Sequence, residues 1–383
     1  MSESDEDPDL DDDLDTELGD EEDNENNEEG PEEEPDAGEK GSDGSGGFEA
    51  GDGEKKPEPK VLPQETPLTA EMIKGGISML CKTGDGLEVA YVKLVVQNRE
   101  LTNVFILSTY IHLRYVDLSF NKLTSLFPLQ NMRFLVSLKV TNNKLTSPQM
   151  SNFPFLQFLD LTGNPLKSTK GIKQHSLEKL ILSKTQLENL EDMTTENLPN
   201  LIHLNITNNA LKKLDGLEHR TLKTLYAAGN KLRNLSGVSR LTSLSRLHLR
   251  DNRISSLKGL EEDHETLEYL NVRSNNLEEV EEAYHLSRMK KLTTLVIADN
   301  AVSDSDSYRV DALVYGRRLQ RIDKDPVEEE ERQEAAELYP QREEERLLAE
   351  REAKERPADE EPDQDDLDSQ RDDDDEDRDE EDD

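Results

Sequence analysis

The sequence predicts an α/β solenoid, in which short similar units stack so that their strands form one curved parallel sheet between two disordered acidic arms. Three observations lead to this fold class. Segment 201–211 has the pattern L-x-x-L-x-L-x-x-N-x-L. The same pattern recurs about every 22 residues through the middle of the chain. Both ends of the chain, in contrast, are rich in Asp and Glu and poor in apolar residues.

Ten units can be aligned on the asparagine position of the pattern, at intervals of 21 to 25 residues. Their leucines keep the same register, which indicates about ten leucine-rich repeats over residues 91–302, each with one short strand. Ten strands spaced by about 4.8 Å give a sheet roughly 45 Å long. Short return segments favour 3₁₀ or irregular backs over full helices. The aligned positions are Arg99, Asn121, Asn143, Asn164, Thr185, Asn209, Asn230, Asn252, Asn275 and Asn300.

The asparagine position has a structural meaning of its own. An amide side chain both donates and accepts, so a stacked column of asparagines is expected to satisfy backbone groups of neighbouring units. Thr185 can do part of this with its hydroxyl group. Arg99 cannot, which predicts that the first unit is a distorted terminal repeat.

Charge divides the chain into three parts. Residues 1–60 hold 27 acidic residues and 4 lysines, residues 326–383 hold 30 acidic and 8 basic residues, and residues 61–325 hold 30 acidic and 34 basic residues. Segments 1–60 and 357–383 lack the apolar content that would offset the entropy of ordering, so both are predicted to be disordered. Such an arm can solubilise the chain, or it can tether a basic partner surface.

Residues 61–90 are predicted to form a helical cap on the first repeat. Apolar residues from Ala70 to Cys81 follow a helix-like spacing, and Thr69 is suited to the N-cap position. Gly84 and Gly86 are expected to end the helix. This cap would cover the apolar face and the open backbone edge of the end strand.

Residues 303–325 are predicted to cap the other end of the array. Val310, Leu313 and Val314 suit a short helix, and a strand-like turn follows at residues 319–322. With its Tyr308–Arg309 pair, this segment resembles the C-terminal cap of SDS22-like intracellular leucine-rich repeat proteins. The resemblance implies that the pair closes the cap and does not bind a ligand.

Residues 326–356 are rich in Glu and Arg, with few apolar residues. This composition predicts a charged helix. Its apolar positions are too few for a coiled-coil seam, so we expect a solvated single helix, with a helix laid along a partner as the alternative.

Cysteine usage and the N-terminal sequence bear on location. Cys81 is the chain's single cysteine, so no intramolecular disulfide can form. The first residues are acidic, where a signal peptide would be basic and then apolar. No apolar run approaches about 18 residues. These features predict an intracellular, reducing location and no membrane partner.

Catalytic motifs were sought and none was found. The sequence has no phosphate-binding loop, no G-x-S-x-G turn, no paired cysteines, and no H-E-x-x-H spacing among its seven histidines. We therefore assign no catalytic, cofactor-binding or metal-binding residue. The function is expected to depend on protein partners, without a small-molecule substrate or nucleic acid.

A binding surface is expected where strand residues flank the inward leucines, because these residues face the concave side. Late in the array, several of them are Arg, Tyr or His, types that are enriched at protein interfaces. We predict a docking site there, with an ordinary solvated sheet as the alternative. Its residues are Tyr226, Arg246, His248, Arg250, Tyr269, Asn271 and Arg273.

Several segments resemble one family of leucine-rich repeat proteins. They are Thr66–Thr69, Leu80–Gly84, Ala90–Leu94, Tyr110–Asp117, Leu247–Asn252 and Tyr269–Asn271. Together they are similar to the family of leucine-rich repeat-containing protein 23, over about residues 66–330. The resemblance includes positions other than leucine, and the acidic arms share only composition with that family.

This resemblance implies a structural part of the third radial spoke in the axoneme of motile cilia and sperm flagella. Such a scaffold would lie in the spoke head or neck, bind other spoke proteins and support flagellar motility. Its location would be the cytoplasm, the cytoskeleton and the ciliary axoneme. Two alternatives remain: an SDS22-like regulatory subunit of a protein phosphatase, and an acidic nuclear leucine-rich repeat protein that binds histones.

Overall fold

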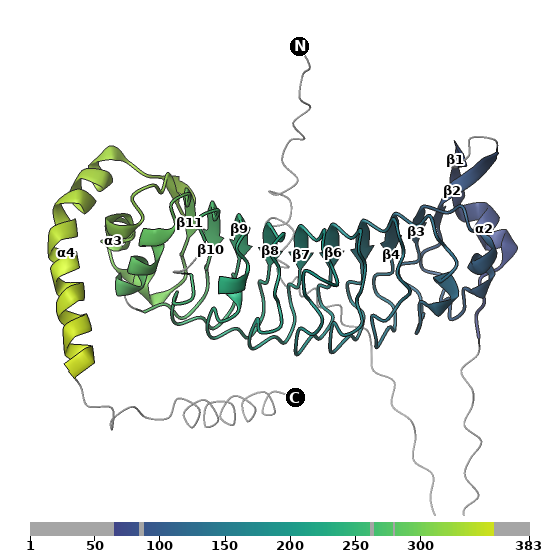
Figure 1. Cartoon of the computed structure of the whole chain (residues 1–383), viewed down its shortest axis with the longest axis horizontal. Coiled ribbons are helices and arrows are strands. Elements are labelled where there is room, and N and C mark those ends of the chain that lie inside the picture. The colour runs from purple at the N-terminus through teal and green to yellow at the C-terminus, as the bar shows by residue number, and fades with distance from the viewer. Residues whose placement is uncertain (1–64, 84–87, 261–263, 279, 356–383) are drawn as a thin grey trace, which may run out of the picture. The chain divides into compact units, whose positions relative to one another are not determined.

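A computed structural model describes residues 65–83, 88–260, 264–278 and 280–355. The predicted disordered arms, 1–60 and 357–383, lie outside these residues. The described residues form one 13-stranded sheet, whose strands follow one another in chain order. Figure 1 shows the strands side by side along one face and the return segments on the other. None of the described helices is long and apolar enough to cross a membrane.

The elements are short, apart from the last helix. The strands are β1 (Ile77–Lys82), β2 (Val89–Val95), β3 (Tyr115–Asp117), β4 (Ser137–Lys139), β5 (Phe158–Asp160), β6 (Lys179–Ile181), β7 (His203–Asn205), β8 (Thr224–Tyr226), β9 (Arg246–His248), β10 (Tyr269–Asn271), β11 (Thr294–Val296), β12 (Arg321–Ile322) and β13 (Asp325–Pro326). The α-helices are α2 (Ala70–Gly76), α3 (Tyr308–Tyr315) and α4 (Glu329–Glu355). The 3₁₀ turns are η1 (Phe105–Thr109), η2 (Phe127–Leu129), η3 (Val238–Arg240), η4 (Val280–Arg288) and η5 (Ala301–Asp304).

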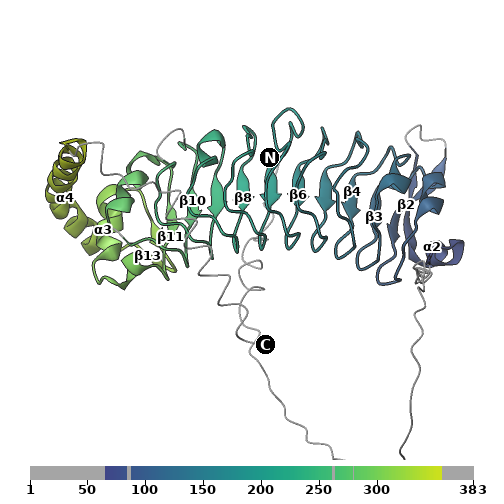
Figure 2. The same ribbon diagram turned by 90° about the horizontal axis from the view of Figure 1, so that it is seen from below.

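The strands of the ten predicted units, β2 to β11, pair in parallel and in one register. β12 of the C-terminal cap adds one more parallel strand. Antiparallel strands, β1 and β13, pair with the outermost parallel strands at the two ends. This arrangement confirms the predicted solenoid with a parallel sheet, and Figure 2 shows the same succession from below. The 3₁₀ turns on the return side confirm the expectation of short backs.

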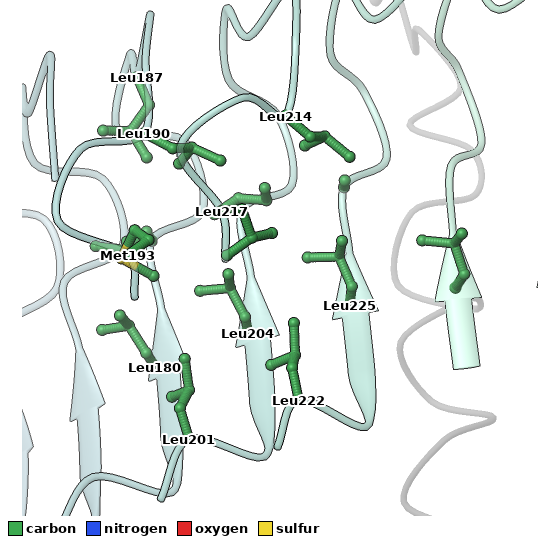
Figure 3. Packing of buried hydrophobic residues seen from close by; sticks show 14 of the residues in the cluster. Leu180, Leu187, Leu190, Met193, Leu201, Leu204, Leu214, Leu217, Leu222 and Leu225 are labelled. Carbon is green, nitrogen blue, oxygen red and sulfur yellow. The ribbon is translucent and has the colours of Figure 1, made fainter. Parts of the chain in front are cut away.

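The core is a column of leucines along the inside of the stack. Leu180, Leu204 and Leu225 occupy matching positions on β6, β7 and β8, and each is fully buried (Figure 3). Return-side residues such as Met193 and Leu217 pack against them from the opposite side. Each unit therefore completes its core only through its neighbours.

The asparagine column satisfies the backbone as predicted. The Oδ1 atom of Asn121 accepts from the backbone N–H groups of Arg99 and Leu101, both at 3.1 Å. Its Nδ2 group donates to the carbonyls of Val96 and Leu118, at 2.9 and 2.8 Å. Asparagine side chains down to Asn300 repeat this pattern in the later units.

Thr185 interrupts the column, in the way its chemistry predicts. Its hydroxyl group donates to the carbonyl of Leu182 at 2.8 Å, replacing one amide donor. It offers no carbonyl oxygen to the preceding unit. The backbone N–H of Leu166 therefore donates to the carbonyl of Asn164. In the other units, the matching leucine or isoleucine donates to the asparagine of the next unit.

The N-terminal cap differs from the prediction. Thr69 is the N-cap of α2, as expected, and its Oγ1 accepts from the backbone N–H of Met72. The helix, however, ends at Gly76, and Ile77–Lys82 form strand β1 instead of further helical turns. A Cβ atom on Gly76 would lie 2.2 Å from the carbonyl oxygen of Val95, so strand β2 passes directly against the end of the helix. Gly84 and Gly86, the expected helix end, lie outside the described residues.

The C-terminal cap has the predicted short helix, α3, followed by strand β12. The Tyr308–Arg309 pair contacts the cap itself. The Tyr308 hydroxyl donates to Asp323 at 3.0 Å, and Arg309 donates to the carbonyl of Ile322 at 2.9 Å. Arg309 also forms an ion pair with Glu331 of α4. These contacts agree with the expected capping role.

Helix α4 is present, but it is not the solvated single helix that the sequence predicts. It packs against α3 with Ala335 buried, and Arg342 bonds the buried Asp311 at 2.9 Å. Arg346 lies over the ring of Tyr284, 4.1 Å from its centroid. These contacts use alanine, tyrosine and charged residues, so a count of large apolar residues misses them.

Candidate protein-binding face

The strands line the concave face of the array, and three of them carry the predicted docking residues. Tyr226 lies on β8, Arg246 and His248 on β9, and Tyr269 on β10. In the parallel register, Tyr226 stands opposite His248, and Arg246 stands opposite Tyr269. Arg250 and Arg273 lie two residues beyond the ends of β9 and β10.

The aromatic residues of this group form one continuous stack across three strands. The ring centroids of Tyr226 and His248 are 4.4 Å apart, with 25° between the ring planes. His248 and Tyr269 are 4.7 Å apart, with 30° between the planes. All three rings are partly exposed. The stack is thus a rigid platform that offers apolar ring surface, with polar groups at its border.

Two of the arginines are held by acidic residues that the sequence reading did not single out. Arg273 Nε donates to Asp299 Oδ2 at 2.6 Å, and Arg250 Nε lies 3.2 Å from Asp251 Oδ2. The hydrogen bond from Arg273 lowers the pKa of Asp299 below its usual value. The hydrogen bond to Asp299 fixes the guanidinium group of Arg273, whereas Asp251 only places a negative charge close to Arg250.

Asp251 and Asp299 share a backbone feature. Both stand directly before the asparagine of their unit, with φ near +56° and +58°. All the other units also place this position in the left-handed region, which Asn, Asp and Gly adopt most easily. These two pairs could have been predicted from the sequence, because an acidic residue occupies this position in the unit of Arg250 and in the unit after Arg273.

Asn271 does not belong to the exposed group. Its side chain is only 3% exposed. Its Oδ1 accepts from the backbone N–H of Arg273 at 3.1 Å, and Nδ2 lies 3.4 Å from the Tyr269 hydroxyl. Asp117 and Asn205 accept in the same way from the residue two positions on. The sequence reading of Asn271 as a docking residue is therefore corrected: the amide supports the turn that ends β10 and the tyrosine beside it.

Within the described ranges, no group of three or more His, Cys, Asp or Glu side chains has an arrangement that could hold a metal ion. The concave cluster offers hydrogen-bond donors, fixed positive charge and ring surface. This combination suits recognition of another polypeptide.

The comparisons with known proteins agree with the fold. Family models described as leucine-rich repeat match residues 112–132, 175–232 and 220–351. Together with the asparagine column, they define the chain as a leucine-rich repeat protein.

Its relatives narrow this class. Human leucine-rich repeat-containing protein 23 is 40% identical over 281 residues, which cover 73% of this chain and 82% of the human protein. The mouse protein of the same name is 38% identical over 280 residues, with the same coverage of 73% and 82%. The chain belongs to the leucine-rich repeat-containing protein 23 family.

Solved structures show a weaker likeness. An internalin from Listeria monocytogenes is 17% identical with a TM-score of 0.42, covering 64% of this chain and 87% of that one. Internalin C2 from the same organism is 23% identical with a TM-score of 0.41, covering 56% and 82%.

Proposed function

We propose that the chain is a non-catalytic structural scaffold of the axoneme in motile cilia and sperm flagella. In this proposal it is part of the third radial spoke, in the head or neck, where it joins other spoke proteins and supports beating. Its location is the cytoplasm, within the axonemal cytoskeleton. Membership of the leucine-rich repeat-containing protein 23 family supports this role, because the family is associated with that spoke.

The stack of Tyr226, His248 and Tyr269 is the observation that most directly supports a binding role. Aligned, partly exposed rings bordered by arginines are typical of interface centres, where aromatic residues and arginine supply most of the binding energy. The fold does not require this stack, because the matching positions on β6 and β7 are Ile181 and Asn205. We therefore place the main partner contact on β8–β10.

The test expresses the tagged full chain in ciliated cells that lack their own copy of this protein. The expected result is that the tagged protein stays with the axoneme after detergent extraction. A variant with Arg246→Glu and Tyr269→Ala should be retained severalfold less, while its melting temperature is unchanged. Lys179→Glu is the matched control, because Lys179 is also exposed and lies in the same row of the sheet on β6.

Complete release of the unmodified protein by detergent would contradict the spoke assignment. Nuclear accumulation would favour the histone-binding alternative, and co-purification with a phosphatase catalytic subunit would favour the regulatory one. Equal retention of the double variant and of Lys179→Glu would contradict the β8–β10 site but not the spoke assignment.

A further inference from the structure

Exposed large apolar side chains gather at the N-terminal end of the array. Of the fourteen found in the described residues, twelve lie between Met79 and Phe155. The other two, Leu347 and Leu348, are in α4. Phe134 and Phe155 are 38% and 54% exposed. An exposed apolar concentration of this kind marks an interaction surface, since folding alone gives no reason to keep it in water.

Three of these repeats share an aromatic edge, formed by His112, Phe134 and Phe155. Each residue stands directly before the first core leucine of its unit. The rings of His112 and Phe134 are 6.1 Å apart at 10°, and those of Phe134 and Phe155 are 6.3 Å apart at 11°. They form a flat, nearly parallel row along the edge of the solenoid.

Later units use the same position for a structural task. Ser176 donates its hydroxyl to the carbonyl of Pro154 at 2.6 Å, and Asn200 donates to the carbonyl of His175 at 2.8 Å. Thr221 donates to the carbonyl of Leu201 at 2.9 Å. Phenylalanine has no group that could make such a bond. The aromatic edge therefore gives up a stabilising contact that the neighbouring units make.

The β1–β2 hairpin turns this edge into a hollow. Cys81, Ala90 and Val92 of the hairpin line it together with His112 and Phe134. Lys82 and Arg114 also line the hollow, and Arg114 Nη2 donates to the carbonyl of Lys82 at 3.4 Å. We call this surface the N-terminal hollow. It is a small hollow whose lining combines apolar side chains with those of Lys82 and Arg114.

Charge indicates which kind of partner fits this surface. The sequence has no acidic residue between Asp117 and Asp160, whereas Lys122, Arg133 and Lys139 lie in that stretch. A symmetric contact between two copies of the chain would bring these basic side chains face to face. An acidic partner would instead be attracted, and its apolar side chains would cover the rings.

We propose that the N-terminal hollow and the aromatic edge bind an acidic amphipathic helix of a partner protein. The ring spacing of 6.1 and 6.3 Å is close to the pitch of an α-helix, about 5.4 Å, so apolar residues one turn apart can each reach a ring. Acidic residues beside them meet Lys82 and Arg114, which line the hollow, and the charge of Arg133, the residue before Phe134. This surface is formed by β1, β2 and the loops before β3, β4 and β5, apart from the β8–β10 site, so the chain has two docking surfaces and can bridge two partners.

Peptide selection on the full chain tests this inference. A phage library of random peptides of about 15 residues, a length that permits a short helix, is panned on the immobilised protein. We expect the enriched peptides to carry apolar residues three or four positions apart, with Asp or Glu between them. Their affinity, measured by fluorescence anisotropy, should fall as salt is raised.

Two variants locate the binding. Phe134→Ser should weaken the selected peptides about tenfold, as expected for a residue at an interface centre. Arg133→Glu should weaken them severalfold, because it reverses the charge of the residue that precedes Phe134. Phe127→Ser is the control: Phe127 is 63% exposed but does not line the hollow, and its change should leave affinity unaltered. Because Arg133 is exposed, its reversal reports on binding even if Phe134→Ser disturbs the fold.

Three outcomes would overturn the proposal. They are the absence of any enriched peptide, enrichment of neutral or basic peptides, and equal binding to Arg133→Glu and Phe127→Ser. Loss of binding to the Arg246→Glu and Tyr269→Ala variant would instead place the peptides on the β8–β10 site, which also contradicts this inference.

Discussion

The two ends of the array face the same problem, since a stack of repeats exposes an apolar face and an open strand edge at each end. Both ends close the edge with an antiparallel strand, β1 at one end and β13 at the other. They differ in what covers the apolar face. At the C-terminal end α3 buries five consecutive residues, Val310–Val314, and α4 packs on α3. At the N-terminal end α2 buries only Ile73.

This difference separates two requirements that are usually met together. Closing the backbone edge needs one paired strand, and both ends have it. Covering the apolar surface needs further structure, and within the described residues the C-terminal end supplies more of it than the N-terminal end. The N-terminal repeats keep Phe105, Phe127, Phe134 and Phe155 in contact with solvent. A partner helix, as proposed above, would give the N-terminal end the cover that α4 gives the C-terminal end.

The largest effect should come from breaking the C-terminal cover. Arg342→Ala removes the ion-pair partner of Asp311, whose side chain is 2% exposed. A buried carboxylate without its partner is costly, so we expect a loss of about 3 kcal/mol in the free energy of unfolding, measured with urea on the full chain. Glu345→Ala, which removes the exposed partner of Arg342, is the control and should change nothing measurable. Equal stability of both variants would show that the pair does not hold the cap.

The second prediction concerns the contact between α2 and β2. Gly76→Ala should lower the free energy of unfolding by about 2 kcal/mol, because the added Cβ meets the backbone carbonyl of Val95. At Gly75 an added Cβ meets nothing within 4 Å. Gly75→Ala should therefore stabilise the helix by about 0.5 kcal/mol. Thermal melts of the two variants should show changes in stability of opposite sign. Changes of the same sign would contradict the close approach of Gly76 to the Val95 carbonyl.

A smaller effect is expected at the start of the N-terminal cap. Thr69→Ala removes the side-chain oxygen that accepts from the backbone N–H of Met72, which should cost about 1 kcal/mol. Thr69→Ser keeps the acceptor and should restore most of the loss. Hydrogen exchange of the α2 amides would show whether the loss stays local, as expected for a repeat fold with nearest-neighbour coupling.

Much of the array could be predicted from the sequence, because its contacts repeat at a fixed interval. The leucine register places Leu204 between Leu180 and Leu225, and the asparagine spacing predicts the column. The interruption of the asparagine column at Thr185 could also be predicted, because a hydroxyl group replaces only part of an amide side chain. The short helix of the C-terminal cap was also predicted, since its apolar spacing is local.

The remainder depends on contacts that periodicity does not encode. Gly76 ends α2 because β2, about twenty residues later, passes against it. Arg342 meets Asp311 across 31 residues of sequence. At the candidate site, the strand register brings Tyr226 and His248 together, but the burial of Asn271 depends on its own hydrogen bonds. The binding role of the cluster stays a prediction.

The smallest effect on stability is expected at the aromatic edge. Phe134→Ser and Phe155→Ser should each change the free energy of unfolding by no more than about 1 kcal/mol, because the two rings are already 38% and 54% exposed. Phe153 provides a matched control two residues away: it is 1% exposed, and Phe153→Ala should cost about 3 kcal/mol or more. Urea unfolding of these variants distinguishes rings at the surface from a ring in the core. A large loss from Phe155→Ser would mean that the ring is structural, and the contrast between the two ends would then no longer point to a partner.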